Sequence, residues 1–182
     1  MRIVIIGNGG SGKSTLADRL GKELGSPVLH LDKITWTENG ERVPEEEFRD
    51  LLGTEMQKDD LIIEGWSYHS TMLTRLSWAD VIIYLKFPLE YCLEKVAERN
   101  REFNNRDYPY DNFTGDRMSM QYLYDEAVRR VHFDYEPQVK EWIASERFGD
   151  KPVIVCRSTD ELNSAYARIL VMLKKIRSQS HE

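Results

Sequence analysis

Residues 1–17 read MRIVIIGNGGSGKSTLA, and this amino-terminal stretch decides the fold of the chain. Residues 3–6 form an unbroken β-branched run closed by Gly7, which is typical of a short strand buried on both faces of a parallel sheet. Apolar residues then recur at helical spacing: Leu16, Ala17, Leu20 and Leu24. Gly25 and Pro27 supply a helix stop. The pattern predicts a strand, a glycine-rich loop and a helix, in that order.

The loop between the expected strand and helix carries a phosphate-binding motif. Residues 7–14, GNGGSGKS, fit the pattern G-x-x-x-x-G-K-S/T at the place where its mechanism requires it. The glycines let successive backbone N–H groups turn inward around a phosphate, and the helix adds the positive end of its dipole. We expect Lys13 to reach the β- and γ-phosphates of ATP and the Ser14 hydroxyl to be a Mg²⁺ ligand. The predicted nucleotide-binding residues are, in this loop, Gly7, Asn8, Gly9, Gly10, Ser11, Gly12, Lys13, Ser14 and Thr15, and, further along the chain, Arg99 and Arg157.

The rest of the chain continues to alternate strands with helices. Apolar runs predict four more strands, at residues 28–31, 61–63, 81–85 and 153–155. Helices are expected at about 44–58, at about 89–99, and after Ser158, which forms a capping box with Glu161. This alternation indicates an α/β fold with a five-stranded parallel sheet covered on both faces.

Length, charge and cysteine content limit the class of protein. The 182 residues suit a single domain over residues 1–182, and 31 acidic against 25 basic residues give a net charge of −6. This balance argues against a protein that binds nucleic acid through its overall field. Two cysteines, Cys92 and Cys156, are too few for a disulfide framework. Residues 1–7 carry no leader or membrane anchor, so we expect a cytoplasmic protein.

Two acidic residues follow predicted strands. Asp32 comes after residues 28–31 and Glu64 after residues 61–63, and the carboxyl ends of parallel strands line the ligand crevice. One carboxylate is expected to hold a Mg²⁺-bound water, while the other accepts a proton from the attacking hydroxyl or orients it. The residues alone leave the two roles unassigned. A plain helix cap or surface acid is the alternative for either one.

An irregular segment at residues 101–115 interrupts the helical pattern, and we interpret the region 100–130 as a lid. Its arginines are candidates to meet charge on a transferring phosphoryl group: Arg99, Arg101, Arg106, Arg117, Arg129 and Arg130. A solvated helix face is the alternative for at least half of them.

Aromatic residues after the second and third strands are candidates for an acceptor pocket. They are Trp36, Trp66, Tyr68 and His69, with Arg75 on the following segment. Packing in the core is the alternative for the tryptophans. His30 is assigned to the sheet, and no histidine is assigned to catalysis or to a metal.

These motifs resemble the adenylate kinase-like and shikimate kinase-like small P-loop kinases, and more closely the bacterial FlaR-like or topology modulation proteins. The matching segments are residues 1–17, HLD at 30–32 with Trp36, PEEEF at 44–48, IIEGWSYH at 62–69, ADVIIYLKFP at 79–88 and PVIVCRS at 152–158. The resemblance implies a three-layer α/β/α sandwich with strand order 2-3-1-4-5. It also implies ATP and Mg²⁺ as cofactors, an acceptor-binding region at about 33–60 and a lid at about 100–130.

The resemblance further implies roles for particular residues. Asp32 corresponds to a carboxylate near Mg²⁺ or the acceptor, and Glu64 with Gly65 stands where the family usually has Asp-Gly. The lid arginines correspond to Arg99, Arg101 and Arg106, and the adenine is expected near Arg157, Ser158 and Thr159. The expected acceptor contacts are Asp32, Trp36, Gly65, Tyr68 and Arg75.

These inferences predict an ATP- and Mg²⁺-dependent kinase that phosphorylates a small hydroxyl- or phosphate-bearing acceptor without binding nucleic acid directly. Two other classes are considered. One is a regulatory protein that binds ATP and closes its lid with little catalysis, because residues 100–120 lack the dense arginine pattern of the family. The other is an ATPase that acts on DNA, which predicts DNA-stimulated hydrolysis that weakens steeply with salt.

Overall fold

A five-stranded parallel sheet forms the centre of the molecule, in the order β2-β3-β1-β4-β5. The computed structural model describes residues 1–37, 41–103 and 117–179. The strands are β1 Arg2–Gly7, β2 Val28–His30, β3 Leu61–Glu64, β4 Val81–Leu85 and β5 Val153–Cys156. The expected α/β fold and strand order are therefore confirmed. Strand β1 pairs on both edges and is covered on both faces, which explains why its run of apolar residues is unbroken.

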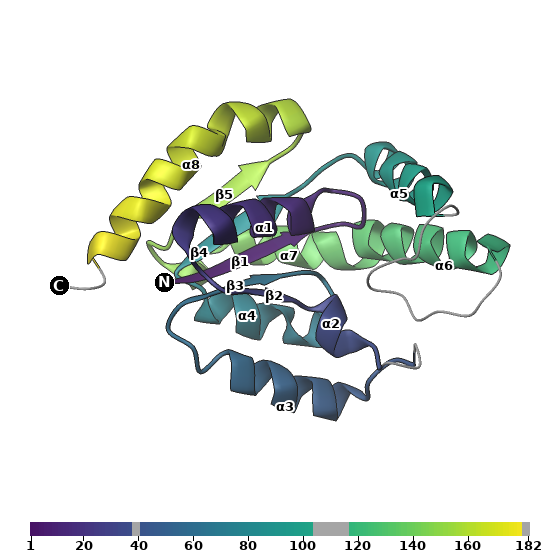
Figure 1. The fold of residues 1–182 in the computed structure, drawn as a ribbon, viewed down its shortest axis with the longest axis horizontal. Helices are drawn as coiled ribbons and strands as arrows, with labels where there is room; N and C mark the ends of the chain where they lie inside the picture. The colour runs from purple at the N-terminus through teal and green to yellow at the C-terminus, as the bar shows by residue number, and fades with distance from the viewer. Residues whose placement is uncertain (38–40, 104–116, 180–182) are drawn as a thin grey trace.

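Helices pack on both faces of the sheet, with α1 and α8 on one side and α3 and α4 on the other (Figure 1). The helices are α1 Lys13–Leu24, α2 Asp32–Thr35, α3 Glu45–Glu55, α4 Met72–Trp78, α5 Leu89–Phe103, α6 Arg117–Arg130, α7 Glu136–Ala144 and α8 Thr159–Gln179. A π-helical segment, Val131–Tyr135, joins α6 to α7. None of the helices in the described ranges combines the length and the apolar content needed to cross a bilayer.

The core consists of two clusters separated by the sheet. Alternate residues of β1 point to opposite faces, so Ile3 and Ile5 pack with α1 and α8, while Val4 and Ile6 pack with α3, α4 and α7. Phe48 of α3 is completely buried in the second cluster. Both faces of the sheet are thus closed by apolar contacts, and its carboxyl edge carries the polar residues of interest.

The element boundaries differ from the expected ones in a few places. Helix α3 ends at Glu55 rather than near residue 58, and α5 continues to Phe103 instead of ending near residue 99. The short helices α2 and α4 were not expected, because four and seven residues are too few to show a helical period. The capping box of α8 is present in part, since the Glu161 N–H donates to Ser158 Oγ at 3.1 Å.

The start of β1 is held by Asp80, which follows α4. Its Oδ2 accepts the Arg2 backbone N–H at 2.8 Å, and its Oδ1 accepts the Arg2 guanidinium at 2.6 and 3.1 Å. Burial alone would raise the pKa of Asp80, but the hydrogen bonds and charge of Arg2 outweigh it and lower that pKa. The ionised carboxylate is the form that the fold stabilises.

We predict that Asp80→Asn lowers the free energy of unfolding by about 1 kcal/mol at pH 7, a value reduced for the partial exposure of the pair. A lowered carboxyl pKa contributes stability above the ordinary Asp pKa of about 3.9, and that contribution disappears as the pH falls through the folded value. The difference between wild type and variant should therefore shrink as the pH falls below about 3.9. Urea unfolding at pH 7, 5 and 3 measures it, with the exposed Asp150→Asn as control; a difference independent of pH would contradict the prediction.

Candidate functional site

The loop between β1 and α1 leaves the amino end of α1 open. The N-cap residue of α1 is Gly12 with φ of 80°, no side chain caps the helix, and its first turn contains no acid. Gly10 also has a positive φ, and a Cβ there would lie 2.5 Å from the Cys92 carbonyl oxygen, so only glycine fits. The free N–H groups and the helix dipole together form a site that suits a phosphate.

Glu64 ends β3 beside this loop. It is 2% exposed, and its Oε2 has no hydrogen-bond partner among the described residues. Burial alone would raise the pKa of the carboxyl, but His30, the charge of Lys13 and the Ser14 hydroxyl outweigh burial and lower it. A buried, ionised carboxylate with one unpartnered oxygen therefore lies close to the Lys13 ammonium and the Ser14 hydroxyl.

His30 connects Glu64 to α1. Its Nδ1 lies 2.7 Å from Glu64 Oε1, and its Nε2 lies 3.0 Å from Asp18 Oδ1. Carboxylate oxygens accept hydrogen bonds, so each ring nitrogen has an acceptor in front of it. The hydrogen bond with Glu64 raises the pKa of His30 against the opposing effect of burial. Sequence reasoning placed His30 in the sheet and assigned it no role; the signal it missed was a polar residue at the end of an apolar strand.

The second acid, Asp32, lies in a different environment. It is the first residue of α2 and is exposed, whereas Glu64 is buried. Within the described residues, no group of three or more acidic, His or Cys side chains gathers to hold a metal ion. A hydroxyl at Ser14 and one free carboxylate oxygen at Glu64 fit Mg²⁺, which keeps several waters and takes few ligands from the protein.

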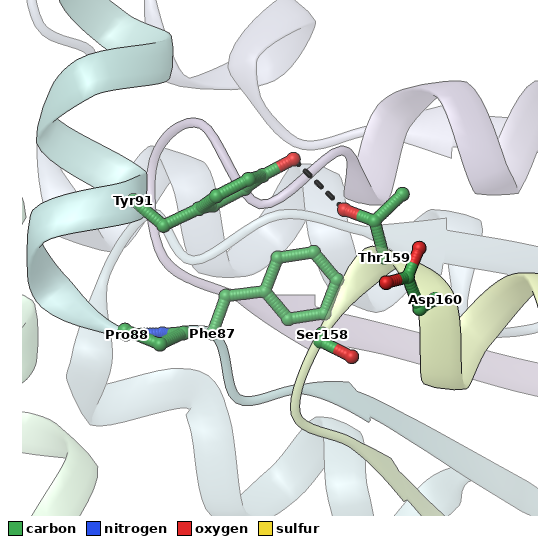
Figure 2. A pocket seen from close by; sticks show the side chains of 6 residues that line it. All are labelled: Phe87, Pro88, Tyr91, Ser158, Thr159 and Asp160. Carbon is green, nitrogen blue, oxygen red and sulfur yellow. Dashed lines mark hydrogen bonds between the residues drawn. The ribbon is translucent and has the colours of Figure 1, made fainter.

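A pocket adjoins the phosphate loop on the side of β5. It has a volume of about 310 Å³ and is lined by Phe87, Pro88, Tyr91, Ser158, Thr159 and Asp160 (Figure 2). Across it, the Tyr91 hydroxyl and Thr159 Oγ1 lie 2.9 Å apart. The pocket lies beside Ser158 and Thr159, where the adenine was expected from the sequence.

A second pocket of about 210 Å³ shares residues with the first and reaches the phosphate loop at Ser11 and Gly12. Arg19 of α1 and Tyr166 of α8 line it, with the guanidinium 3.5 Å from the ring centroid. Sequence reasoning missed these two residues, because the pocket combines helices that are far apart in the chain. Arg157 lines neither pocket; it is exposed, with its guanidinium 3.6 Å from Glu161.

The expected acceptor residues lie in three different environments. Trp36 is 45% exposed, next to α2. Tyr68 is half-buried: its hydroxyl donates to the Val43 carbonyl, and its ring packs against Phe48. Arg75 is completely buried on α4, so it is closed to direct contact with a ligand in this conformation.

The Arg75 guanidinium donates hydrogen bonds to the backbone of the loop that follows Glu64. It donates to the carbonyl oxygens of Gly65 at 2.9 Å and Trp66 at 2.7 Å, and burial lowers its pKa to about 9. Its Nε also donates to the Thr71 hydroxyl at 3.3 Å, and these neutral acceptors compensate less for a buried cation than a carboxylate would. Arg75 therefore acts on the candidate acceptor region through the backbone of this loop.

The expected lid is described in part. Arg106 and the rest of residues 104–116 lie outside the described residues. Arg99 of α5 lies over the Tyr124 ring at 5.5 Å, and the Arg101 Nε donates to the Ala97 carbonyl at 3.3 Å. On the returning helix, the Val128 carbonyl accepts a hydrogen bond from the Asn8 side chain at 2.9 Å. The phosphate loop thus contacts α6 directly.

Comparisons with known proteins found one curated relative and several solved structures of similar fold. No family model matches the chain. Adenylate kinase 2 of Nostoc sp. (strain PCC 7120 / SAG 25.82 / UTEX 2576) is 35% identical over 82 residues, and the match covers 36% of this chain and 44% of that protein. The chain therefore spans less than half the length of this curated relative.

Two solved structures match nearly the whole chain. Shikimate kinase from Acinetobacter baumannii in complex with shikimate has a TM-score of 0.58 at 18% identity, covering 96% of this chain and 93% of that one. Shikimate kinase from Bacteroides thetaiotaomicron has a TM-score of 0.55 at 14% identity, covering 96% and 98% respectively. Likeness at these identities concerns the fold, and on this ground the chain has a small P-loop kinase-like fold.

Proposed function

We propose that this chain is an ATP- and Mg²⁺-dependent kinase that transfers the γ-phosphoryl group of ATP to a small hydroxyl- or phosphate-bearing acceptor. The observation that carries the proposal is the free oxygen of the buried Glu64 carboxylate beside Lys13 and Ser14. In this proposal the amides of residues 7–15 hold the phosphates, and the nucleobase lies in the pocket that Phe87, Tyr91 and Thr159 line. The proposed acceptor side is the region 33–60 with Gly65 and Tyr68.

The reaction needs little covalent chemistry from the protein. An acceptor oxygen forms a bond to the γ-phosphorus, the bond from that phosphorus to its bridging oxygen breaks, and ADP leaves with the electron pair. Lys13 stabilises charge on the phosphates, and Mg²⁺ when bound would neutralise more of it. Asp32 is assigned as the proton acceptor because it is exposed next to the acceptor region, and Glu64 as the acid on the metal side because it is buried beside Ser14.

A nucleotide-sensing regulatory protein is the second candidate. The contacts of Arg99 and Arg101 favour it, because one guanidinium lies over the Tyr124 ring and the other donates to its own helix. Neither contact is with a residue of the phosphate loop. Turnover decides between the two functions, since kinases run at about 1–100 per second and a sensor would be far slower.

The test of the proposed function is a thermal-shift screen of nucleotides and candidate acceptors, followed by turnover assays on the pairs that stabilise together. ATP with Mg²⁺ at 100 times its Kd should stabilise wild type by about 2.7 kcal/mol. Lys13→Ala should keep the far-UV circular dichroism spectrum and lose about 10²–10³-fold in ATP turnover, because it removes a preorganised charge. Lys22→Ala, at the far end of α1, is the control. Unimpaired ATP consumption by Lys13→Ala would rule the proposal out.

Asp32→Asn tests the proposed proton acceptor. We expect kcat to fall about 10²–10⁴-fold, because an amide does not accept the proton, while the Kd for ATP changes by less than about twofold. Steady-state kinetics with the acceptor found by the screen, together with calorimetric ATP titration, give both quantities. Asp150→Asn, at an exposed position outside the proposed acceptor region, should match wild type. An unchanged kcat in Asp32→Asn would mean that another group accepts the proton.

Thr159→Trp tests the proposed nucleobase pocket. An indole at this position should fill much of the cavity and raise the Kd for ATP at least about tenfold, or 1.4 kcal/mol. Inorganic triphosphate contacts only the phosphate loop in this proposal, so its affinity should stay unchanged. Ser164→Trp, exposed further along α8, controls for a surface tryptophan. Equal losses for ATP and triphosphate would place the base elsewhere.

A further inference from the structure

We propose that His30 is a positioning residue, which holds one oxygen of the Glu64 carboxylate and so leaves the other for the metal side of the bound nucleotide. The inference rests on the function proposed above. It assigns a role to His30, to which the sequence analysis gave only a place in the sheet.

The fold fixes His30 against Glu64 before any side chain is considered. The two residues are register partners on the adjacent parallel strands β2 and β3, so their side chains leave the sheet next to each other. The resulting contact, from Nδ1 to Glu64 Oε1 at 2.7 Å, is buried, with His30 8% and Glu64 2% exposed. Water competes little for this hydrogen bond, and the bond therefore determines how the carboxylate is oriented.

The other ring nitrogen fixes the rotation of the imidazole. His30 Nε2 lies 3.0 Å from Asp18 Oδ1 on α1, the helix that begins at the phosphate loop. The Asp18 side chain is 61% exposed, so water weakens this outer contact much more than the inner one. His30 thus links β2, β3 and α1, and the inner hydrogen bond is the one that matters for Glu64.

The second oxygen of the Glu64 carboxylate has no hydrogen-bond donor among the described residues. A carboxylate accepts on both oxygens, yet Glu64 Oε2 has no hydrogen-bond partner within the described part of the chain although it is shielded from solvent. Lys13 and Ser14 are close enough to lower the pKa of this group. A bound hydrated cation with the phosphates would supply the missing donors, provided that Glu64 keeps this orientation.

Loss of the inner hydrogen bond has a specific consequence. Without it, the carboxylate is free to rotate toward the Lys13 ammonium and pair with it. The gain in nucleotide affinity that Mg²⁺ provides should then shrink, whereas binding through the loop amides persists. A general structural role for His30 would instead weaken binding with and without the metal equally.

Two substitutions separate the inner contact from the outer one. In His30→Asn the amide nitrogen takes the place of Nδ1 and keeps a donor toward Glu64, while in His30→Gln the amide reaches the place of Nε2, toward Asp18. Calorimetry measures the Kd for ATP with Mg²⁺ and with EDTA, and the ratio of the two values gives the Mg²⁺-dependent gain. We expect His30→Gln and Glu64→Gln each to reduce this gain about tenfold, as losses of supporting partners at metal sites do.

Further expected results complete the test. His30→Asn and Asp18→Asn should keep most of the gain, and the His30→Gln/Glu64→Gln double variant should lose no more than Glu64→Gln alone. Every variant that keeps Glu64 should bind ATP in EDTA within about twofold of wild type. Thermal unfolding checks each fold, and if His30→Gln does not fold, the comparison of His30→Asn with Glu64→Gln decides in the same way.

The outcomes distinguish this inference from the proposed function. If wild type does not bind ATP, or gains nothing from Mg²⁺, the proposed function fails. If wild type shows the gain but His30→Gln retains it, if His30→Asn loses it as fully as Glu64→Gln, or if the two losses add in the double variant, the role of His30 is overturned while the proposed function stands.

Discussion

The uncapped amino end of α1 is the constraint on which the rest of the structure depends. The central strand β1 is followed by helix α1 after a short loop, and the first amides of α1 have no side-chain cap. Because the first residues of α1 are largely exposed, water or a bound ligand satisfies their N–H groups. The left-handed backbone at Gly10 and Gly12 makes the connection possible, and the close approach of the Cys92 carbonyl packs α5 against it. The phosphate loop is therefore held by the core on one side and open on the other.

Asn8 connects this loop to the helices that follow the expected lid. It is 1% exposed, its amide donates to the Val128 carbonyl at 2.9 Å, and its Oδ1 accepts the Gly9 N–H at 2.8 Å. Such a buried side chain has no freedom to bind solvent, so it couples the position of α6 to the shape of the loop. The sequence suggested Asn8 only as a nucleotide contact; its side chain in fact bonds within the protein.

Local patterns predicted the fold because each decisive signal was short-range. The β-branched run of β1, the glycine stop of α1 and the Ser158 cap of α8 all concern residues within a few positions of one another. The parallel sheet also followed from the alternation of strands and helices, whereas the strand order was expected only from the resemblance to small P-loop kinases.

The candidate site was less predictable, because its geometry depends on contacts between distant segments. The sequence named Asp32 and Glu64 as a pair, but burial of one and exposure of the other arise from strand length and the turn into α2. His30 contacts Glu64 only because of the register between β2 and β3. Arg75 reaches its position only because α4 packs on the sheet, and α4 is too short to show a helical period in the sequence. Spacing along the chain carries no information about either contact.

The buried guanidinium of Arg75 also fixes the chemical character of the turn after β3. Every peptide bond in the described residues is trans, so a carbonyl and the N–H of the next residue point in opposite directions. Because Arg75 holds the carbonyls of Gly65 and Trp66, the N–H groups of Trp66 and Ser67 point away from it. A molecule that approaches this turn from the side opposite Arg75 therefore meets hydrogen-bond donors. If the two carbonyl groups pointed to that side instead, the Arg75 guanidinium would lose these acceptors inside the hydrophobic core.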